Sequence, residues 1–313
     1  MKKISLYMLL ICLSIGGWVS IRLDALQSFL LPQANESSYI RTMKQDLLCL
    51  MMAYPGYITG IEIGDNKGVY IVMKSGKKIL YDDRQEKSYQ EKLANPDLQD
   101  MMEVIYPLEQ ITRLMPENYD PGRIRVYPLL YEIYGSSKTE IEQNLRNVKS
   151  GYRYYPFNHQ NGAAAALELL MEELVPLSEK RPDIYPFVFP MNGTFNYRQI
   201  AGTGQLSPHS FGIAIDLARD NKDYWKWVSR EEGQKRLDSY PLEVVEIFEK
   251  HNFIWGGKWA HFDILHFEYR PEIILKARYF SEKKDFNSPW YEGITAIEDR
   301  VKDYIQMLDR VLE

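Results

Sequence analysis

The sequence contains very little cysteine. Among its 313 residues only Cys12 and Cys49 are cysteines, and Cys12 falls in an apolar segment near the N-terminus. One remaining thiol cannot form an intrachain disulfide, so a hydrophobic core must stabilise the fold. Hydrophobic residues make up 45% of the chain, which suffices for one large or two modest domains.

Runs of basic residues are also absent. The 38 Lys and Arg residues are outnumbered by 43 Asp and Glu residues, which gives a formal net charge of −5. Nucleic-acid-binding domains present a basic face, so the composition argues against a nucleic-acid partner. The oligomeric state is left open by the sequence.

The N-terminus has the pattern of an export signal. A basic start at residues 1–3 precedes an apolar run over residues 4–21. We expect residues 1–26 to be a signal peptide or an uncleaved signal anchor, because the run is just long enough to cross a bilayer and lacks a good cleavage site. The expected location is the periplasm or cell envelope, with membrane contact only through this segment if it stays uncleaved.

The remaining chain divides by pattern into three parts. Residues 27–150 are predicted to form a small α+β region, and residues 151–280 a domain that holds the polar motifs described below. Residues 281–313 are predicted to form a C-terminal amphipathic helix, because an apolar stripe runs over residues 291–312.

Alternating apolar residues and turn signals predict antiparallel strands in the first part. After a helix over residues 39–52, we expect strands at 57–63 and 69–74 and a third strand after Ser75-Gly76.

Two further helices are predicted around the middle of the chain. Ser137 and Glu140 have the spacing of a capping box, which predicts a helix reaching about Val148. The Ala- and Leu-rich segment 163–174 predicts a helix that ends before Pro176.

The residues with the most informative chemistry lie in two short segments. Residues 207–217 read Ser-Pro-His-Ser-Phe-Gly-Ile-Ala-Ile-Asp-Leu, and residues 263–268 read Asp-Ile-Leu-His-Phe-Glu. A catalytic zinc takes three protein ligands and keeps a fourth position for water. His209, Asp216 and His266 supply such a set, and one aspartate, Asp263, is left over as a base.

The pattern Ser-x-His-x-x-Gly-x-Ala-x-Asp, followed by a carboxylate-x-x-His, resembles the D-alanyl-D-alanine carboxypeptidase and L-alanyl-D-glutamate endopeptidase family. By motif the resemblance covers about residues 150–275. It implies that His209, Asp216 and His266 bind one zinc ion per chain, with Asp263 as general base. It also implies an α+β fold of the hedgehog and D-Ala-D-Ala peptidase type, with a small antiparallel sheet and flanking helices.

Strand periodicity adds a geometric expectation. On an extended chain His209 and Asp216 point to opposite faces, so they can meet one ion only if the strand kinks, and Gly212 is where a bulge is tolerated. Asp263 is expected at the entry of the second strand and His266 just inside it.

Glu268 shares a strand face with His266. We expect it to accept a hydrogen bond from an imidazole rather than to bind the metal, because a fourth protein ligand would leave no position for water. The alternative, that Glu268 is the base and Asp263 the holder, stays open.

Three more polar residues are candidates for the site. Arg198 is the candidate partner for the oxyanion, with a surface ion pair as the alternative. His261 is a candidate for stabilising the tetrahedral intermediate, against a structural role. Ser207 is expected to hydrogen-bond the substrate or a ligand carboxylate, against a role in forming a turn.

Two other polar segments are interpreted as surface and loop chemistry. These are the Asp82-Asp83 pair and the turn Asp120-Pro121-Gly122-Arg123.

The sequence therefore predicts an exported zinc peptidase whose substrate is the peptide of peptidoglycan. Asp263 would take a proton from water and return it to the leaving amine. Removal of a terminal D-Ala and cleavage between L-Ala and D-Glu are not distinguished. The alternative is a non-catalytic, zinc-containing cell-wall binding module of the hedgehog-like fold, against which the presence of Asp263 argues.

Export gives a first prediction. The full-length protein should be found outside the cytoplasm after fractionation of cells that produce it, because residues 1–26 carry the signal pattern. The mass of the exported form then separates cleavage from anchoring. Recovery of the native protein in the cytoplasmic fraction would contradict the prediction.

Overall fold

The computed structural model describes three stretches of the chain, which are residues 38–282, 288–295 and 297–312. Backbone contacts divide the chain into residues 1–44 and residues 45–313. The second unit contains the sheets and the site described below.

The expected signal segment, residues 1–26, lies outside the described residues. Among the helices that the structure describes, none has the length and apolar character needed to cross a membrane. The predicted helix at residues 39–52 is confirmed as helical residues 38–53.

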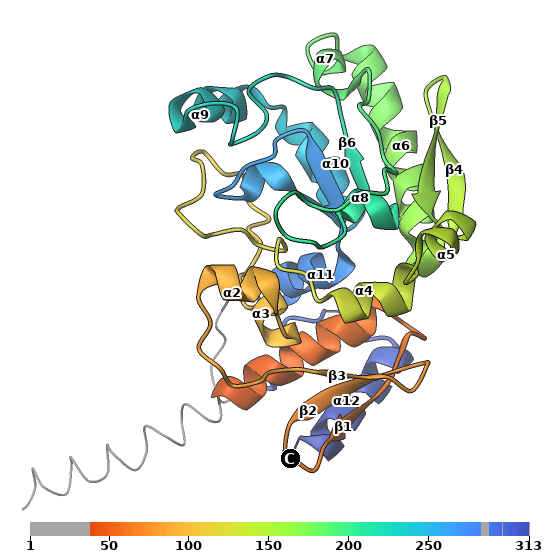
Figure 1. Cartoon of the computed structure of the whole chain (residues 1–313), viewed down its shortest axis with the longest axis vertical. Coiled ribbons are helices and arrows are strands. Elements are labelled where there is room, and N and C mark those ends of the chain that lie inside the picture. Colours follow the sequence, from red (N-terminus) through yellow and green to blue (C-terminus); the bar gives the residue numbers. More distant parts are fainter. Residues whose placement is uncertain (1–37, 283–287, 296, 313) are drawn as a thin grey trace, which may run out of the picture. The chain divides into compact units, whose positions relative to one another are not determined.

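The first antiparallel sheet is confirmed in the predicted order. It consists of β1 (Ile58–Ile63), β2 (Val69–Met73) and β3 (Lys78–Leu80), with β2 in the centre. Helix α12 (Asp299–Val311) contacts β1 and buries Val301, Ile305 and Leu308 (Figure 1). The amphipathic C-terminal stripe is therefore a docked face.

The C-terminal helix is shorter than predicted. It begins at Asp299 rather than near residue 291, and Gly293 shows why. The backbone φ of Gly293 is +128°, which is not helical, and a Cβ there would lie 2.1 Å from the Tyr279 carbonyl oxygen. A close backbone approach interrupts the apolar stripe before the helix starts.

A β-hairpin follows the capping sequence at Ser137. Helix α5 (Lys138–Gln143) is capped by Ser137 but ends before Val148, which lies in β4 (Leu145–Ser150). The prediction of a helix to Val148 is wrong because β4 pairs along its whole length with β5 (Arg153–Asn158). Those strand hydrogen bonds outweigh the local helical pattern.

Helix α6 (Ala163–Lys180) covers the hairpin and runs through Pro176. The predicted end before Pro176 is therefore wrong. A proline inside a helix costs about 3 kcal/mol. In α6 the residues on both sides of the proline stay buried, among them Leu174 and Ser178. The helix packs against β4 and helix α10 (Leu242–Lys250), and this packing offsets the lost hydrogen bond.

The central sheet carries the motifs. Its three short antiparallel strands lie in the order β6 (Ala214–Asp216), β8 (His266–Tyr269), β7 (Phe253–Trp255). Helices α10 and α11 (Pro271–Phe280) pack against β7, and helix α8 (Pro208–Phe211) leads into β6. The predicted α+β class is confirmed, with helices around small antiparallel sheets (Figure 1).

Short helices connect these sheets. They are α2 (Tyr89–Ala94), α3 (Leu98–Met102), α4 (Tyr127–Tyr134), η1 (Gln160–Gly162), α7 (Tyr185–Val188), α9 (Arg230–Ser239) and η2 (Gly256–Lys258).

Gly212 gives a prediction for the fold. Its φ is +67° and a Cβ would lie 2.6 Å from Leu145 Cδ2, so Gly212→Ala combines backbone strain with overpacking. We expect a loss of about 2–5 kcal/mol in the free energy of unfolding, measured with denaturant. Gly202→Ala is the control, because Gly202 has φ +81° and nothing within 4 Å, so only strain of about 1–2 kcal/mol applies. Equal losses in the two variants would contradict the close packing at Gly212.

Candidate metal centre and its pocket

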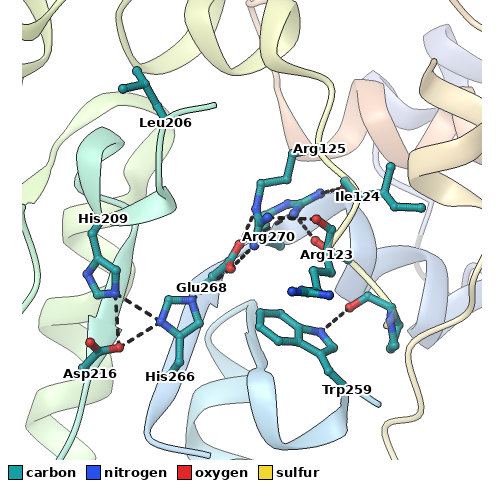
Figure 2. A network of polar contacts seen from close by, with 12 residues as sticks. Arg123, Ile124, Arg125, Leu206, His209, Asp216, Trp259, His266, Glu268 and Arg270 are labelled. Atoms are coloured by element: carbon teal, nitrogen blue, oxygen red, sulfur yellow. Dashed lines mark hydrogen bonds and ion pairs between the residues drawn. The ribbon is translucent and has the colours of Figure 1, made fainter. Parts of the chain in front are cut away.

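The three predicted ligands lie together. His209 is on α8, and Asp216 on β6 lies directly opposite His266 on β8 in the antiparallel register. Asp216 Oδ1 is 3.2 Å from His209 Nε2 and 2.9 Å from His266 Nδ1, and the two nitrogens are 3.1 Å apart (Figure 2). One ligand atom from each residue lies within 4.8 Å of the others.

The chain reaches this geometry by a helical turn. The expected kinked strand is wrong, because His209 lies on α8 and only Asp216 lies on a strand. Gly212 ends the helix in the left-handed conformation, and its carbonyl accepts a hydrogen bond from Asn158 N. The sequence predicted a change of direction at Gly212, but it predicted a strand bulge where the structure has the end of a helix.

Hydrogen bonds orient both imidazole rings. His209 Nδ1 contacts the carbonyl oxygen of Thr194, and His266 Nε2 lies 2.9 Å from Glu268 Oε1. Since a carbonyl or carboxylate accepts, these nitrogens carry the protons. The other nitrogen of each ring, Nε2 of His209 and Nδ1 of His266, faces Asp216 Oδ1.

Electrostatics at this point favour positive charge. Burial disfavours a charged His266, yet the hydrogen bonds to Asp216 and Glu268 raise the pKa of His266 to about 10. Burial also acts to raise the pKa of Asp216, but the charges and hydrogen bonds of His209 and His266 hold it well below its usual range. The carboxylates of Asp216 and Glu268 therefore favour a positive charge on His266.

The donor set fits zinc. Two imidazole nitrogens and one carboxylate oxygen are the ligand types of catalytic zinc sites. The remaining nitrogen of each ring is hydrogen-bonded to an acceptor, which fixes the ring orientation.

Asp263 lies at the predicted place, immediately before β8. Its backbone N donates to Gly256 O and its carbonyl accepts from His266 N at 3.1 Å. The side chain lines the same pocket as the three ligands. Burial, with a further contribution from the charge of Asp216, raises the pKa of Asp263 to about 6.

Glu268 makes the predicted contact with an imidazole and is fully buried. Its carboxylate also accepts hydrogen bonds from Arg125 Nε, at 3.1 Å, and from Arg125 Nη2, and Arg270 Nη1 lies 3.7 Å away (Figure 2). Burial acts to raise the pKa of Glu268, but the charges and hydrogen bonds of Arg125 and His266 outweigh it and hold that pKa well below its usual range.

His261 lines the pocket and is hydrogen-bonded to Asp120, which does not line it. His261 N and Nδ1 lie 2.9 Å and 2.6 Å from the two carboxylate oxygens of Asp120. The imidazole stacks on Tyr89 with an interplanar angle of 4°, and Tyr89 Oη donates to Asp120. The interpretation of the 120–123 turn as a surface loop is therefore wrong, because Asp120 is buried and positions a pocket residue.

Arg123 and Arg125 also line the pocket, and sequence reasoning missed both. They flank Ile124, which is buried, just after the Asp-Pro-Gly turn. Charged residues on either side of a buried one at a turn are a weak signal, because exposed loops show the same pattern. Nothing in their spacing pointed to a motif more than 80 residues away.

Arg198 and Ser207 lie at the pocket as predicted. The Arg198 side chain is exposed, and no described residue forms an ion pair or hydrogen bond with its guanidinium, so the surface ion pair is not observed. Ser207 is buried at the start of α8, and its side chain makes no capping hydrogen bond. Its backbone N donates to the Arg198 carbonyl, which joins the two residues.

A second group of carboxylates lies away from this pocket. Asp82, Asp83 and Asp97 approach one another, but Lys87 Nζ lies 2.9 Å from both Asp83 and Asp97. An ammonium already occupies the position that a cation would take.

Metal binding gives a prediction. The purified protein should hold about one zinc ion per chain after dialysis, and His209→Ala or His266→Ala should lose it, since each variant removes one of three ligands. Elemental analysis measures the stoichiometry. His159→Ala is the control, because His159 is exposed and lies outside the cluster. Full zinc retention in the double variant of His209 and His266 would show that the metal binds elsewhere.

Comparisons with known proteins give one family match and one relative. Residues 201–269 match the family described as D-alanyl-D-alanine carboxypeptidase. A 70-residue segment is 41% identical to the peptidoglycan L-alanyl-D-glutamate endopeptidase CwlK of Bacillus subtilis (strain 168). The aligned segment spans 22% of this chain and 42% of that relative, and no solved structure gives a significant match. The resemblance to the D-alanyl-D-alanine carboxypeptidase and L-alanyl-D-glutamate endopeptidase family is thus confirmed, for the segment that supplies His209, Asp216 and His266.

Proposed function

We propose that the protein is a zinc-dependent peptidase that hydrolyses stem peptides of peptidoglycan. The observation that carries this proposal is the convergence of His209, Asp216 and His266 beside Asp263, in one pocket and within the segment matched by the peptidase family. The similarity to the endopeptidase CwlK also supports the more general inference that the protein is a hydrolase acting on peptides.

His209, Asp216 and His266 would hold the metal. Bound zinc polarises a carbonyl group and makes water more acidic. The ligand rings are aimed by Thr194 and Glu268, so this chain supplies a rigid site.

Asp263 is the general base of the proposed reaction. It takes a proton from the water that attacks the scissile carbonyl and gives that proton to the departing amine. Two observations favour Asp263 over Glu268. Asp263 has no side-chain hydrogen bond to a described residue, whereas Glu268 is fully buried, accepts hydrogen bonds from Arg125 and His266, and forms an ion pair with Arg270.

Arg198 is the proposed partner of the developing oxyanion. Its guanidinium has no partner among the described residues, so it can donate to the carbonyl oxygen as negative charge grows there. The Ser210 hydroxyl accepts from Arg198 N at 2.8 Å and donates to its carbonyl at 2.7 Å, which anchors the loop. Ser207 and His261 line the pocket and are proposed to contact the peptide.

The proposed catalytic unit includes more than residues 151–280. Asp120, Arg123 and Arg125 come from the predicted N-terminal region and contribute to the pocket or to its wall. Export, and membrane contact through residues 1–26, remain predictions.

The choice of base gives a prediction. Asp263→Asn should keep zinc and lose about a hundred- to ten-thousand-fold in turnover, because an amide cannot accept the proton. Glu268→Gln should instead weaken zinc binding by about 10- to 100-fold, because it disturbs the ring of His266. Purified peptidoglycan is the substrate, and mass spectrometry of the released muropeptides identifies the bond.

The controls are the metal-stripped wild type and its reconstitution with zinc. An Asp263→Asn protein with wild-type turnover, beside a metallated but inactive Glu268→Gln protein, would assign the base to Glu268. Zinc binding without any change in muropeptide masses would indicate the non-catalytic binding module instead.

A further inference from the structure

Three arginines line the pocket. They differ in how many of their guanidinium nitrogens donate hydrogen bonds to other residues. Arg125 donates through Nε and Nη2 to Glu268 and through Nη1 to the Arg123 carbonyl. Arg123 uses one nitrogen, because Nη1 donates to Tyr89 Oη at 2.8 Å while Nε and Nη2 have no partner among the described residues. Arg125 is therefore structural, whereas Arg123 has donors to offer.

Asp120 attracts the guanidinium of Arg123 without accepting a hydrogen bond from it. Arg123 Nη1 lies 3.6 Å from Asp120 Oδ2, which is beyond a hydrogen bond. The same carboxylate already accepts from His261 N, His261 Nδ1 and Tyr89 Oη. The guanidinium of Arg123 is thus fixed in position, and its side chain remains 25% exposed.

Tyr224 lies between the proposed base and the charges of Arg123 and Arg198 in electrostatic terms, because its phenol responds to all three. Its backbone forms a bridge with Asp263. Burial and the charge of Asp263 raise the pKa of Tyr224, and the charges of Arg123 and Arg198 act in the opposite direction. Both guanidinium groups therefore lie within electrostatic reach of one phenol beside the base, and all four residues line the same pocket.

We propose that Arg123 binds a carboxylate of the substrate, carried by the carbon that bears the departing nitrogen. The proposal rests on the proposed peptidase function and names a substrate feature that it requires. D-alanyl-D-alanine and L-alanyl-D-glutamate both place a carboxylate on that carbon. Arg123 is then a specificity residue that selects a free carboxylate over an amidated one.

Arg123 suits this role better than Arg198. A planar guanidinium can bind a carboxylate with two parallel hydrogen bonds, provided that its orientation is fixed beforehand. Tyr89 and Asp120 fix Arg123, whereas the exposed side chain of Arg198 is anchored only through its backbone. Arg198 remains the partner of the carbonyl oxygen, which every peptide substrate has.

The test compares matched peptides. One pair ends in D-Ala-D-Ala with a free or amidated terminus, and the other contains L-Ala-γ-D-Glu with a free or amidated α-carboxyl group. Wild-type protein should cleave the free form of its preferred pair with a kcat/KM about 10- to 100-fold higher than the amide, the size expected for a charged hydrogen bond. Arg123→Gln should lower kcat/KM for the free form alone.

Three variants complete the comparison. Arg123→Lys should restore part of the preference by keeping the charge. Arg113→Gln removes an exposed arginine that does not line the pocket and should change neither rate. Arg198→Gln should lower both rates together. The amide rate of Arg123→Gln reports on folding, since an unfolded variant would lose both activities.

Binding gives a second readout that does not depend on turnover. Calorimetry with the Asp263→Asn protein should show about 10- to 100-fold tighter binding of the free form, and adding Arg123→Gln should abolish the difference. The carboxylate proposal is overturned if the wild type cleaves the free and amidated forms at equal rates. It is also overturned if Arg198→Gln loses the preference for the free form and Arg123→Gln keeps it. Neither result contradicts the proposed peptidase function. If neither pair is cleaved by the wild type or bound by Asp263→Asn, the proposed function fails as well.

Discussion

The site depends on a buried carboxylate that is surrounded by cations. Glu268 is fully buried, and an isolated charge there would be strongly destabilising. Arg125 and Arg270 supply positive charge, and His266 supplies a ring nitrogen 2.9 Å away. The network therefore fixes the ring of His266, a proposed metal ligand, and at the same time holds a segment distant in sequence against β8. Removing Arg125 or His266 would leave the buried charge of Glu268 without one of its partners.

That distant segment is residues 120–125. Arg270 donates to the Gly122 carbonyl, and Arg125 donates to Glu268, so two buried arginines hold its backbone against the central sheet. Once it is held there, Asp120 reaches His261 and Arg123 faces the pocket. Part of the pocket wall is therefore built by a segment that lies outside the family match at residues 201–269.

The sequence predicted the parts whose chemistry is local. The convergence of His209, Asp216 and His266 followed from the motif spacing, and the Glu268 contact followed from strand alternation beside His266. Errors arose where tertiary packing overrode a local pattern, as at Val148, whose strand pairing replaced a helix, and at Pro176, whose burial let a helix continue. The 120–125 wall could not be predicted, because no local rule connects an arginine to a carboxylate 143 residues away.

The stability of the fold does not by itself require this ionic arrangement. Apolar residues of similar volume can replace a buried ion pair with little loss, because desolvation cancels much of the attraction. Apolar groups, however, could not accept a hydrogen bond from His266 and so orient its other nitrogen toward Asp216. They also could not hold the 120–125 backbone by directed hydrogen bonds. The polar network therefore orients the site: the carboxylate of Glu268 fixes the ring of His266, the proposed metal ligand, and through Arg125 it also fixes the segment that carries Arg123, the proposed substrate-binding arginine.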